Sequence, residues 1–200
     1  MKAFTLPGVE RANDLIHEAN VIMFKVWMEE IVFTWRWWIE ISILILPWVY
    51  FWFYLRKKPD TYRLVCAGFS TMLSATYMDV VGMALRLWGY PTKEVPLVPP
   101  FITWDLCAIP VITMVFLHYQ RKVNPILKSI VLGILGSFVM QPFAVWVGLY
   151  IPYHWKHVYS FPLVIIIYLG ANYFYNMFSF RKPNKYNAYR RAHRIKKSKS

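Results

Sequence analysis

Apolar residues fall into five long blocks along the chain, separated by short polar joints. The blocks cover residues 34–55, 64–87, 99–118, 126–150 and 159–180. None of them alternates strictly between apolar and polar positions. Blocks of about 20 apolar residues are typical of helices that cross a bilayer, whereas strands of a membrane barrel need about 10 alternating residues. The pattern therefore predicts an all-α, polytopic membrane protein with five transmembrane helices.

Polar and apolar positions also separate in the segment before the first block, residues 1–33. Its polar residues recur at helical spacing, at Arg11, Asp14, Glu18, Lys25 and Glu29. Its apolar residues do the same, at Leu15, Ala19, Ile22, Met23 and Val26. Spacings of three, four and seven put each set on its own face of a helix. We predict an amphipathic helix that lies on the outer membrane surface or against a partner.

Charge sets the predicted orientation. The chain has 23 Lys and Arg but 10 Asp and Glu, for a net charge of +13. The basic residues are concentrated in the joints after the first and third blocks, at Arg56, Lys57, Lys58, Arg63, Arg121, Lys122 and Lys128. Loops rich in Lys and Arg stay in the cytoplasm. This distribution predicts an N-terminus outside and a C-terminus in the cytoplasm of a protein in the cell membrane.

The last 20 residues, 181–200, form a basic tail. Its basic residues are Arg181, Lys182, Lys185, Arg190, Arg191, Arg194, Lys196, Lys197 and Lys199. Directly below a span, such a tail meets anionic lipid first. We therefore predict lipid contact, keep a protein partner or homo-oligomer as alternatives, and regard nucleic acid as a poor fit.

Polar residues inside the blocks are the candidate functional residues. Entering from outside, the third block reaches Asp105 after ~9 Å, and the first reaches Glu40 at a similar depth. The second block rises from inside and meets Asp79 after ~22 Å of a ~30 Å core, and the fourth meets Gln141 after a similar climb. Arg86 follows Asp79 by seven residues, which places it on the same helix face. A polar layer in the outer half is expected, with Arg86 compensating one acid.

An ionised carboxylate that faces lipid costs at least ~2.5 kcal/mol, so these groups are expected to face the bundle interior or a water-filled recess. Two roles remain open for Asp79 and Asp105. They form either a hydrogen-bonded network that locks the bundle, or a site for a proton, a cation or a polar ligand.

Other chemistries have little support in the sequence. Asp79 and Asp105 raise the alternative of an intramembrane aspartyl hydrolase, but the expected G-x-G-D pattern is absent around both. His154 and His157 lack a third ligand nearby for a metal. Phosphate-binding glycine loops and nucleophile elbows are also missing. We expect no enzymatic activity, no cofactor and no metal.

Several segments resemble a family of small, uncharacterised five-span integral membrane proteins of spore-forming bacteria. They are FTWRWWIEISILILPWVYFWFYLRKK, DVVGMALRLWGYP, VPLVPPFITWDLCAIPV, HYQ and HWKHVYSFPLVIIIY. The shared pattern is a Trp-rich first span, an Asp before W-x-Y-P, and a second Asp ahead of a proline. The resemblance implies the same topology and marks Asp79 and Asp105, without naming a substrate. It also marks a structural loop with Trp88, Tyr90, Pro91, Pro96 and Pro110.

Two hypotheses about function follow. The first is a non-enzymatic membrane or accessory protein in which a buried carboxylate layer in the outer half ties the bundle together. The second is a small ion- or proton-coupled transporter or sensor that uses Asp79 and Asp105.

Overall fold

A computed structural model of the chain describes residues 6–98, 101–119 and 123–177. It is all-α and 78% helical, as the hydropathy pattern predicted. Four helical segments are long and apolar enough to cross a membrane: Trp35–Leu55, Thr61–Ala84, Pro125–Val147 and His157–Met177. This arrangement fits a membrane protein. The basic tail, residues 181–200, lies outside the described residues.

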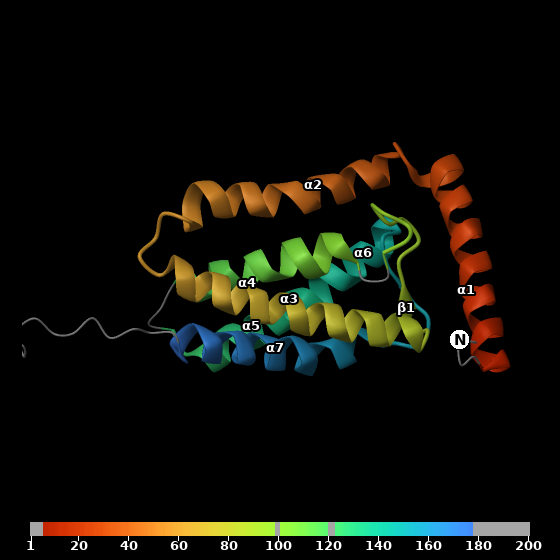
Figure 1. Ribbon diagram of the computed structural model, residues 1–200. Coiled ribbons are helices and arrows are strands. Elements are labelled where there is room, and N and C mark those ends of the chain that lie inside the picture. Colours follow the sequence, from red (N-terminus) through yellow and green to blue (C-terminus); the bar gives the residue numbers. More distant parts are fainter. Residues whose placement is uncertain (1–5, 99–100, 120–122, 178–200) are drawn as a thin grey trace, which may run out of the picture.

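The first helix, α1 (Pro7–Val26), stands apart from the others. It runs nearly at right angles to the bundle and at one end of it (Figure 1). None of its residues is buried, and a π-helical turn, η1 (Trp27–Ile31), follows it. The predicted amphipathic segment is therefore a helix.

Two long helices follow. Helix α2 (Trp35–Tyr50) is capped by Thr34, whose side chain accepts a hydrogen bond from the Trp37 backbone N–H. A π turn, η2 (Phe51–Leu55), extends the helix at its other end. Helix α3 (Thr61–Ala84) runs back in the opposite direction (Figure 1). The second block thus begins and ends three residues earlier than the predicted 64–87.

The third apolar block forms a shorter helix than predicted. A π turn, η3 (Thr103–Ala108), leads into α4 (Ile109–His118). Together they make a segment below the length of the four long helices. Figure 1 shows α4 between α2 and α3, and Pro110, Val111, Met114 and Leu117 are buried there. One face of the segment that carries Asp105 is therefore buried against its neighbours.

The remaining helices complete the bundle. Helix α5 (Pro125–Ile134), the π turn η4 (Leu135–Met140) and α6 (Gln141–Val147) form one continuous segment. That segment ends at Gly148, whose φ of 83° is a left-handed conformation suited to glycine. Helix α7 (His157–Met177) packs against α3 and α5.

The two connections at the α1 end of the bundle are joined to each other. Two-residue strands β1 (Trp88–Gly89) and β2 (Ile151–Pro152) pair antiparallel. Residues 85–98, which include β1, are called the cap below. The pairing fixes the cap over the ends of α3 and α6, close to the acids of the helices.

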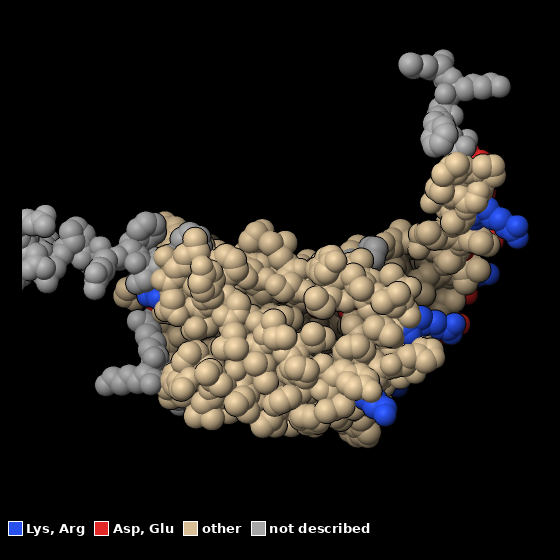
Figure 2. All heavy atoms as spheres, turned by 90° about the horizontal axis from the view of Figure 1, so that it is seen from below, with Lys and Arg blue, Asp and Glu red and all other residues tan. Residues whose placement is uncertain are grey.

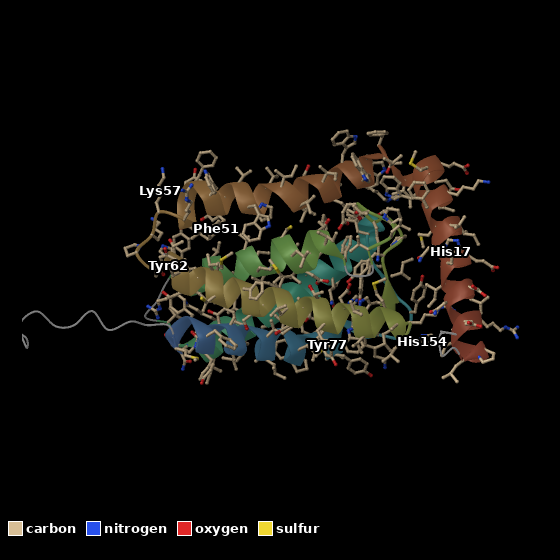
Figure 3. All side chains as sticks on the ribbon, in the orientation of Figure 1. His17, Phe51, Lys57, Tyr62, Tyr77 and His154 are labelled. Atoms are coloured by element: carbon tan, nitrogen blue, oxygen red, sulfur yellow. The ribbon has the colours of Figure 1, made fainter. Side chains whose placement is uncertain are left out.

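Apolar side chains cover the flank of the bundle, and charged ones gather at its ends. The face in Figure 2 is almost entirely uncharged, with Lys and Arg at both ends and along α1. His154 lies at the cap end, whereas Lys57 lies at the opposite end (Figure 3). This distribution suits a bundle whose flank contacts lipid.

Candidate functional site: a buried carboxyl cluster

Asp79, near the end of α3, is the best-satisfied acid in the structure's described part. Its Oδ1 accepts hydrogen bonds from Trp88 Nε1 at 2.8 Å and from the Tyr90 hydroxyl at 2.6 Å. Its Oδ2 accepts one from the Phe101 backbone N–H at 3.0 Å. The side chain is only 4% exposed. Three donors that follow α3 in sequence thus converge on one buried carboxylate, which ties the cap to the helix.

Gly82 makes this arrangement sterically possible. A Cβ atom at this position would collide with the indole ring of Trp88. Because glycine has no Cβ, the ring lies flat over the helix and directs its N–H at Asp79.

Asp105 lies in the π turn η3, close enough to Asp79 for the two carboxyl groups to interact electrostatically. It is 4% exposed, and its Oδ2 has no hydrogen-bond partner. π-Helical turns often occur at functional positions, where they redirect a side chain. The two acids marked by the sequence are therefore brought together, as predicted.

Two further acids extend the group. Glu40 of α2 is fully buried and accepts a hydrogen bond from Thr92 Oγ1 at 2.9 Å. Glu94 of the cap is 4% exposed and accepts one from the Thr103 backbone N–H at 3.2 Å. Each keeps one carboxylate oxygen, Oε2, without a partner. The predicted polar layer therefore includes Glu40, and it gains Glu94, which the sequence analysis did not single out.

Lys93 is the cation of this group. Its Nζ donates a hydrogen bond to the Val98 carbonyl oxygen at 3.0 Å. Burial lowers the pKa of Lys93 below its ordinary value, and the negative charges of all four acids oppose that shift. We call Glu40, Asp79, Lys93, Glu94 and Asp105 the carboxyl cluster.

The cap is held from the other side by tryptophans. Trp27 Nε1 donates to the Lys93 carbonyl oxygen at 2.8 Å, and Trp37 Nε1 donates to the Glu94 carbonyl oxygen at 3.3 Å. Tyr90 stacks on Phe101, with ring centroids 4.1 Å apart. Burial, followed by the charges of Asp79 and Asp105, raises the pKa of Tyr90 well above its ordinary value. Tyr90 therefore remains a proton donor at any physiological pH.

Arg86 does not take the predicted place beside the acids. Helix α3 ends at Ala84, and Arg86 adopts a left-handed φ of 55°. Its side chain is exposed, and its guanidinium lies 5.3 Å from the centre of the Tyr153 ring. The seven-residue spacing from Asp79 does not apply because the helix stops between the two residues. Lys93 occupies the position expected for Arg86.

Gln141 is also directed elsewhere. Its Nε2 donates to Ser160 Oγ at 2.8 Å, and its Oε1 lies 3.2 Å from His157 Nδ1. The side chain thus connects α6 to the start of α7. Gln141 nevertheless lines the same cavity as Asp105.

The loop residues marked by the resemblance have different roles. Trp88 and Tyr90 hold Asp79. Pro91 is exposed and Pro96 is half-buried, both in the cap, whereas Pro110 is fully buried in the first turn of α4. The side chains of Trp88 and Tyr90 thus link this loop directly to Asp79.

Metal ligation finds no support in the described geometry. Within residues 6–98, 101–119 and 123–177, no three His, Cys, Asp or Glu side chains are grouped to hold an ion. His154 and His157 contact different partners, the Arg86 carbonyl oxygen and Gln141.

No family model matches the chain, and no curated protein or solved structure does so either. The resemblance to small membrane proteins of spore-forming bacteria therefore stays a prediction. The geometry of the carboxyl cluster is the basis for a proposal about function.

Proposed function

We propose that this chain is a non-enzymatic integral protein of the cell membrane whose carboxyl cluster fastens the cap to the helix bundle. The observation that carries the proposal is the set of three hydrogen bonds on Asp79. A buried carboxylate with several donors is stable, and removing it leaves those donors unpaired. The cluster thereby holds a rigid outer surface that a partner protein or a second copy of the chain recognises.

We propose five spans, with Thr103–His118 as the third. Four longer helices are available, and this shorter one lies between α2 and α3, which supports counting it as a span despite its reduced length. An odd number of spans puts the cap outside and the basic joints inside. Arg56, Lys57, Lys58 and Arg63 lie around the start of α3, at the end opposite the cap, which supports this orientation.

We propose that α1 lies in the outer membrane interface. Its direction across the bundle end and its unburied side chains support this placement. Leu15, Ile22 and Met23 are among its exposed apolar residues, at 57%, 64% and 45%. An amphipathic helix with such a face partitions into the headgroup region. The basic tail, outside the described residues, is proposed to contact anionic lipid on the inner side.

A second candidate function is a proton- or cation-coupled sensor or transporter that uses Asp79 and Asp105. It is favoured by the unpaired buried oxygens of Glu40, Glu94 and Asp105. Lys93, rather than Arg86, would then set the affinity of the site.

Thermal unfolding of the purified protein separates the two candidates. Wild type, Asp79→Asn and Asp105→Asn would be compared from pH 5 to 9, with and without Na⁺, K⁺ or Mg²⁺. A fastening role predicts that Asp79→Asn lowers Tm by roughly 5 °C or more under every condition, since each kcal/mol shifts Tm by a few degrees. Wild-type Tm is then independent of the cation.

A sensing role predicts a different result. Wild-type Tm would depend on pH or on one cation, and folded Asp105→Asn would lose that dependence. Asp14→Asn on exposed α1 is the matched control and leaves Tm unchanged in both cases. An Asp79→Asn variant as stable as wild type would rule out the fastening role.

A further inference from the structure

A cavity of about 340 Å³ lies beside the carboxyl cluster. Its walls come from η3, α4, the α5–α6 segment and α7. Most are apolar, formed by Trp104, Ile109, Ile112, Phe116, Leu132, Leu135, Met140, Ala144 and Val164. Polar side chains are concentrated at the end near the cap, where Asp105, Tyr90 and Tyr150 line it. The cavity therefore has a long apolar part and a polar end.

The cavity is elongated along the bundle. Asp105 and Phe116 both line it and are eleven residues apart on one helix, which corresponds to about 16 Å. Ile112, Leu135 and Met140 line it as well and are 37%, 41% and 38% exposed, so the cavity reaches the flank of the bundle. The face of the bundle in Figure 2 is almost entirely uncharged. In a bilayer, as proposed above, a dissolved molecule would reach the cavity from the side.

Asp105 lies at the polar end. Its side chain is 96% buried and lines the cavity together with Tyr90 and Tyr150. The charges of four acids act on Lys93, the cation of the cluster, so a positively charged group is favoured at this end over a neutral one.

We propose that this cavity binds a single-chain amphiphile with a protonated amine, its chain along the apolar walls and its ammonium group on Asp105. A fatty acid would bring a fifth carboxylate against the cluster. A purely apolar molecule would place no polar group beside Asp105. A phospholipid would bring a phosphate to the acids and two chains to a cavity of about 340 Å³. Charge and shape together thus select an aliphatic amine.

Gly136 offers a way to fill the cavity without disturbing the helices. It lines the cavity, and a Cβ there would meet only Val164 Cγ2, at an ordinary 3.7 Å. Gly136→Leu therefore projects new carbons into the apolar part. Gly170→Leu is the matched control, because a Cβ at Gly170 on α7 has no neighbour within 4 Å. Asp105→Asn removes the charge at the polar end.

Native mass spectrometry of the detergent-purified full chain would count bound probes directly. Dodecylamine, dodecanol and dodecanoate have the same chain length and differ in the head group. We expect one dodecylamine per chain, weaker binding of dodecanol and no binding of dodecanoate. Gly136→Leu and Asp105→Asn are each expected to weaken dodecylamine binding at least tenfold, with Gly170→Leu equal to wild type.

Three results would overturn the proposal. They are the absence of a dodecylamine adduct on wild type, equal binding of dodecanoate, and unchanged binding by Gly136→Leu. If Asp105→Asn does not fold, the head-group series and the two glycine variants still decide the question. The outcome is independent of the fastening role, because a stabilising Asp79 neither requires nor excludes an occupied cavity.

Discussion

The two ends of the bundle bury different sets of charged groups. At the cap end, the charges of four acids act on Lys93. At the other end, Asp60 Oδ2 accepts a hydrogen bond from the Tyr175 hydroxyl at 2.7 Å and lies 3.3 Å from His118 Nδ1, while Arg63, Lys128 and Tyr175 line one pocket.

Both ends nevertheless use the same kind of partner. The cap-end acids are bound by indole, hydroxyl and backbone N–H donors. At the opposite end, Lys128 Nζ donates to the carbonyl oxygens of Phe116 and Tyr119 at 2.7 and 2.6 Å, at the C-terminal end of α4. Neutral dipoles of the chain thus stabilise buried charge at each end. Stability should therefore depend on the side chains that position these dipoles.

The largest expected difference in stability is between alanine substitutions at two glycines of α3, Gly82 and Gly68. In Gly82→Ala the new Cβ collides with the Trp88 ring, and the hydrogen bond to Asp79 is lost with it. We expect unfolding free energy to fall by about 2–4 kcal/mol. In Gly68→Ala the Cβ lies 2.9 Å from Met114 Sδ, which is flexible, so the change should stay within about 1 kcal/mol.

Denaturant unfolding of both variants in one detergent measures this contrast. Alanine favours a helix over glycine by about 1 kcal/mol at either site, so propensity cancels from the comparison. Equal stability of the two variants would mean that Trp88 does not depend on the space above Gly82.

A smaller effect is expected from removing one hydroxyl at each end. Tyr90→Phe deletes the 2.6 Å bond to Asp79, and Tyr175→Phe deletes the 2.7 Å bond to Asp60. Hydrogen bonds to charged groups contribute about 1.5–3 kcal/mol each. Because the two sites are at opposite ends, the double variant should equal the sum within about 0.5 kcal/mol. A larger deviation in denaturant unfolding would show that the two ends are coupled through the bundle.

The smallest effect is spectroscopic. Because the pKa of Tyr90 is raised, its phenol should stay protonated through about pH 10, where ordinary tyrosines ionise. The stabilisation by the protonated Tyr90 hydroxyl is complete below that pH. It is lost as pH rises further, because the tyrosine of the unfolded state then releases its proton while that of the folded state keeps it. Absorbance at the tyrosinate band, wild type minus Tyr90→Phe, should show no titration step there. A step near pH 10 would place Tyr90 in contact with solvent.

Hydropathy was sufficient to predict most of the fold. The four long helices agree with their apolar blocks to within about three residues, because lipid-facing helices leave a continuous apolar pattern. The third block, residues 99–118, gives only Thr103–His118 within the described part. Phe101 lies outside the helix and donates its backbone N–H to Asp79, a role that hydropathy alone does not register.

The candidate site was predictable only in part. Depth along the helices was enough to bring Asp79, Asp105 and Glu40 together. Lys93 and Glu94 were missed because they lie in a proline-rich connection, where charged residues are usually solvated. The nearest signal was the adjacent Lys-Glu pair between Pro91 and Pro96.

Two residues were misplaced by helical geometry. Arg86 lies beyond the end of α3. Gln141 follows the π turn η4, whose extra residue rotates what comes after it by about 100° relative to a regular helix. Periodicity predicts the direction of a side chain only while the helix remains regular.

The π turns have a consequence for how this chain tolerates insertions and deletions. η3 holds Asp105 at the cavity and is followed directly by α4, while η4 precedes the segment that closes the opposite wall. Removing one residue from either turn would restore regular helix but rotate one wall against the other. The shape of the cavity therefore depends on the number of residues from Asp105 to Pro110 and from Gly136 to Gln141 as much as on the identity of those residues.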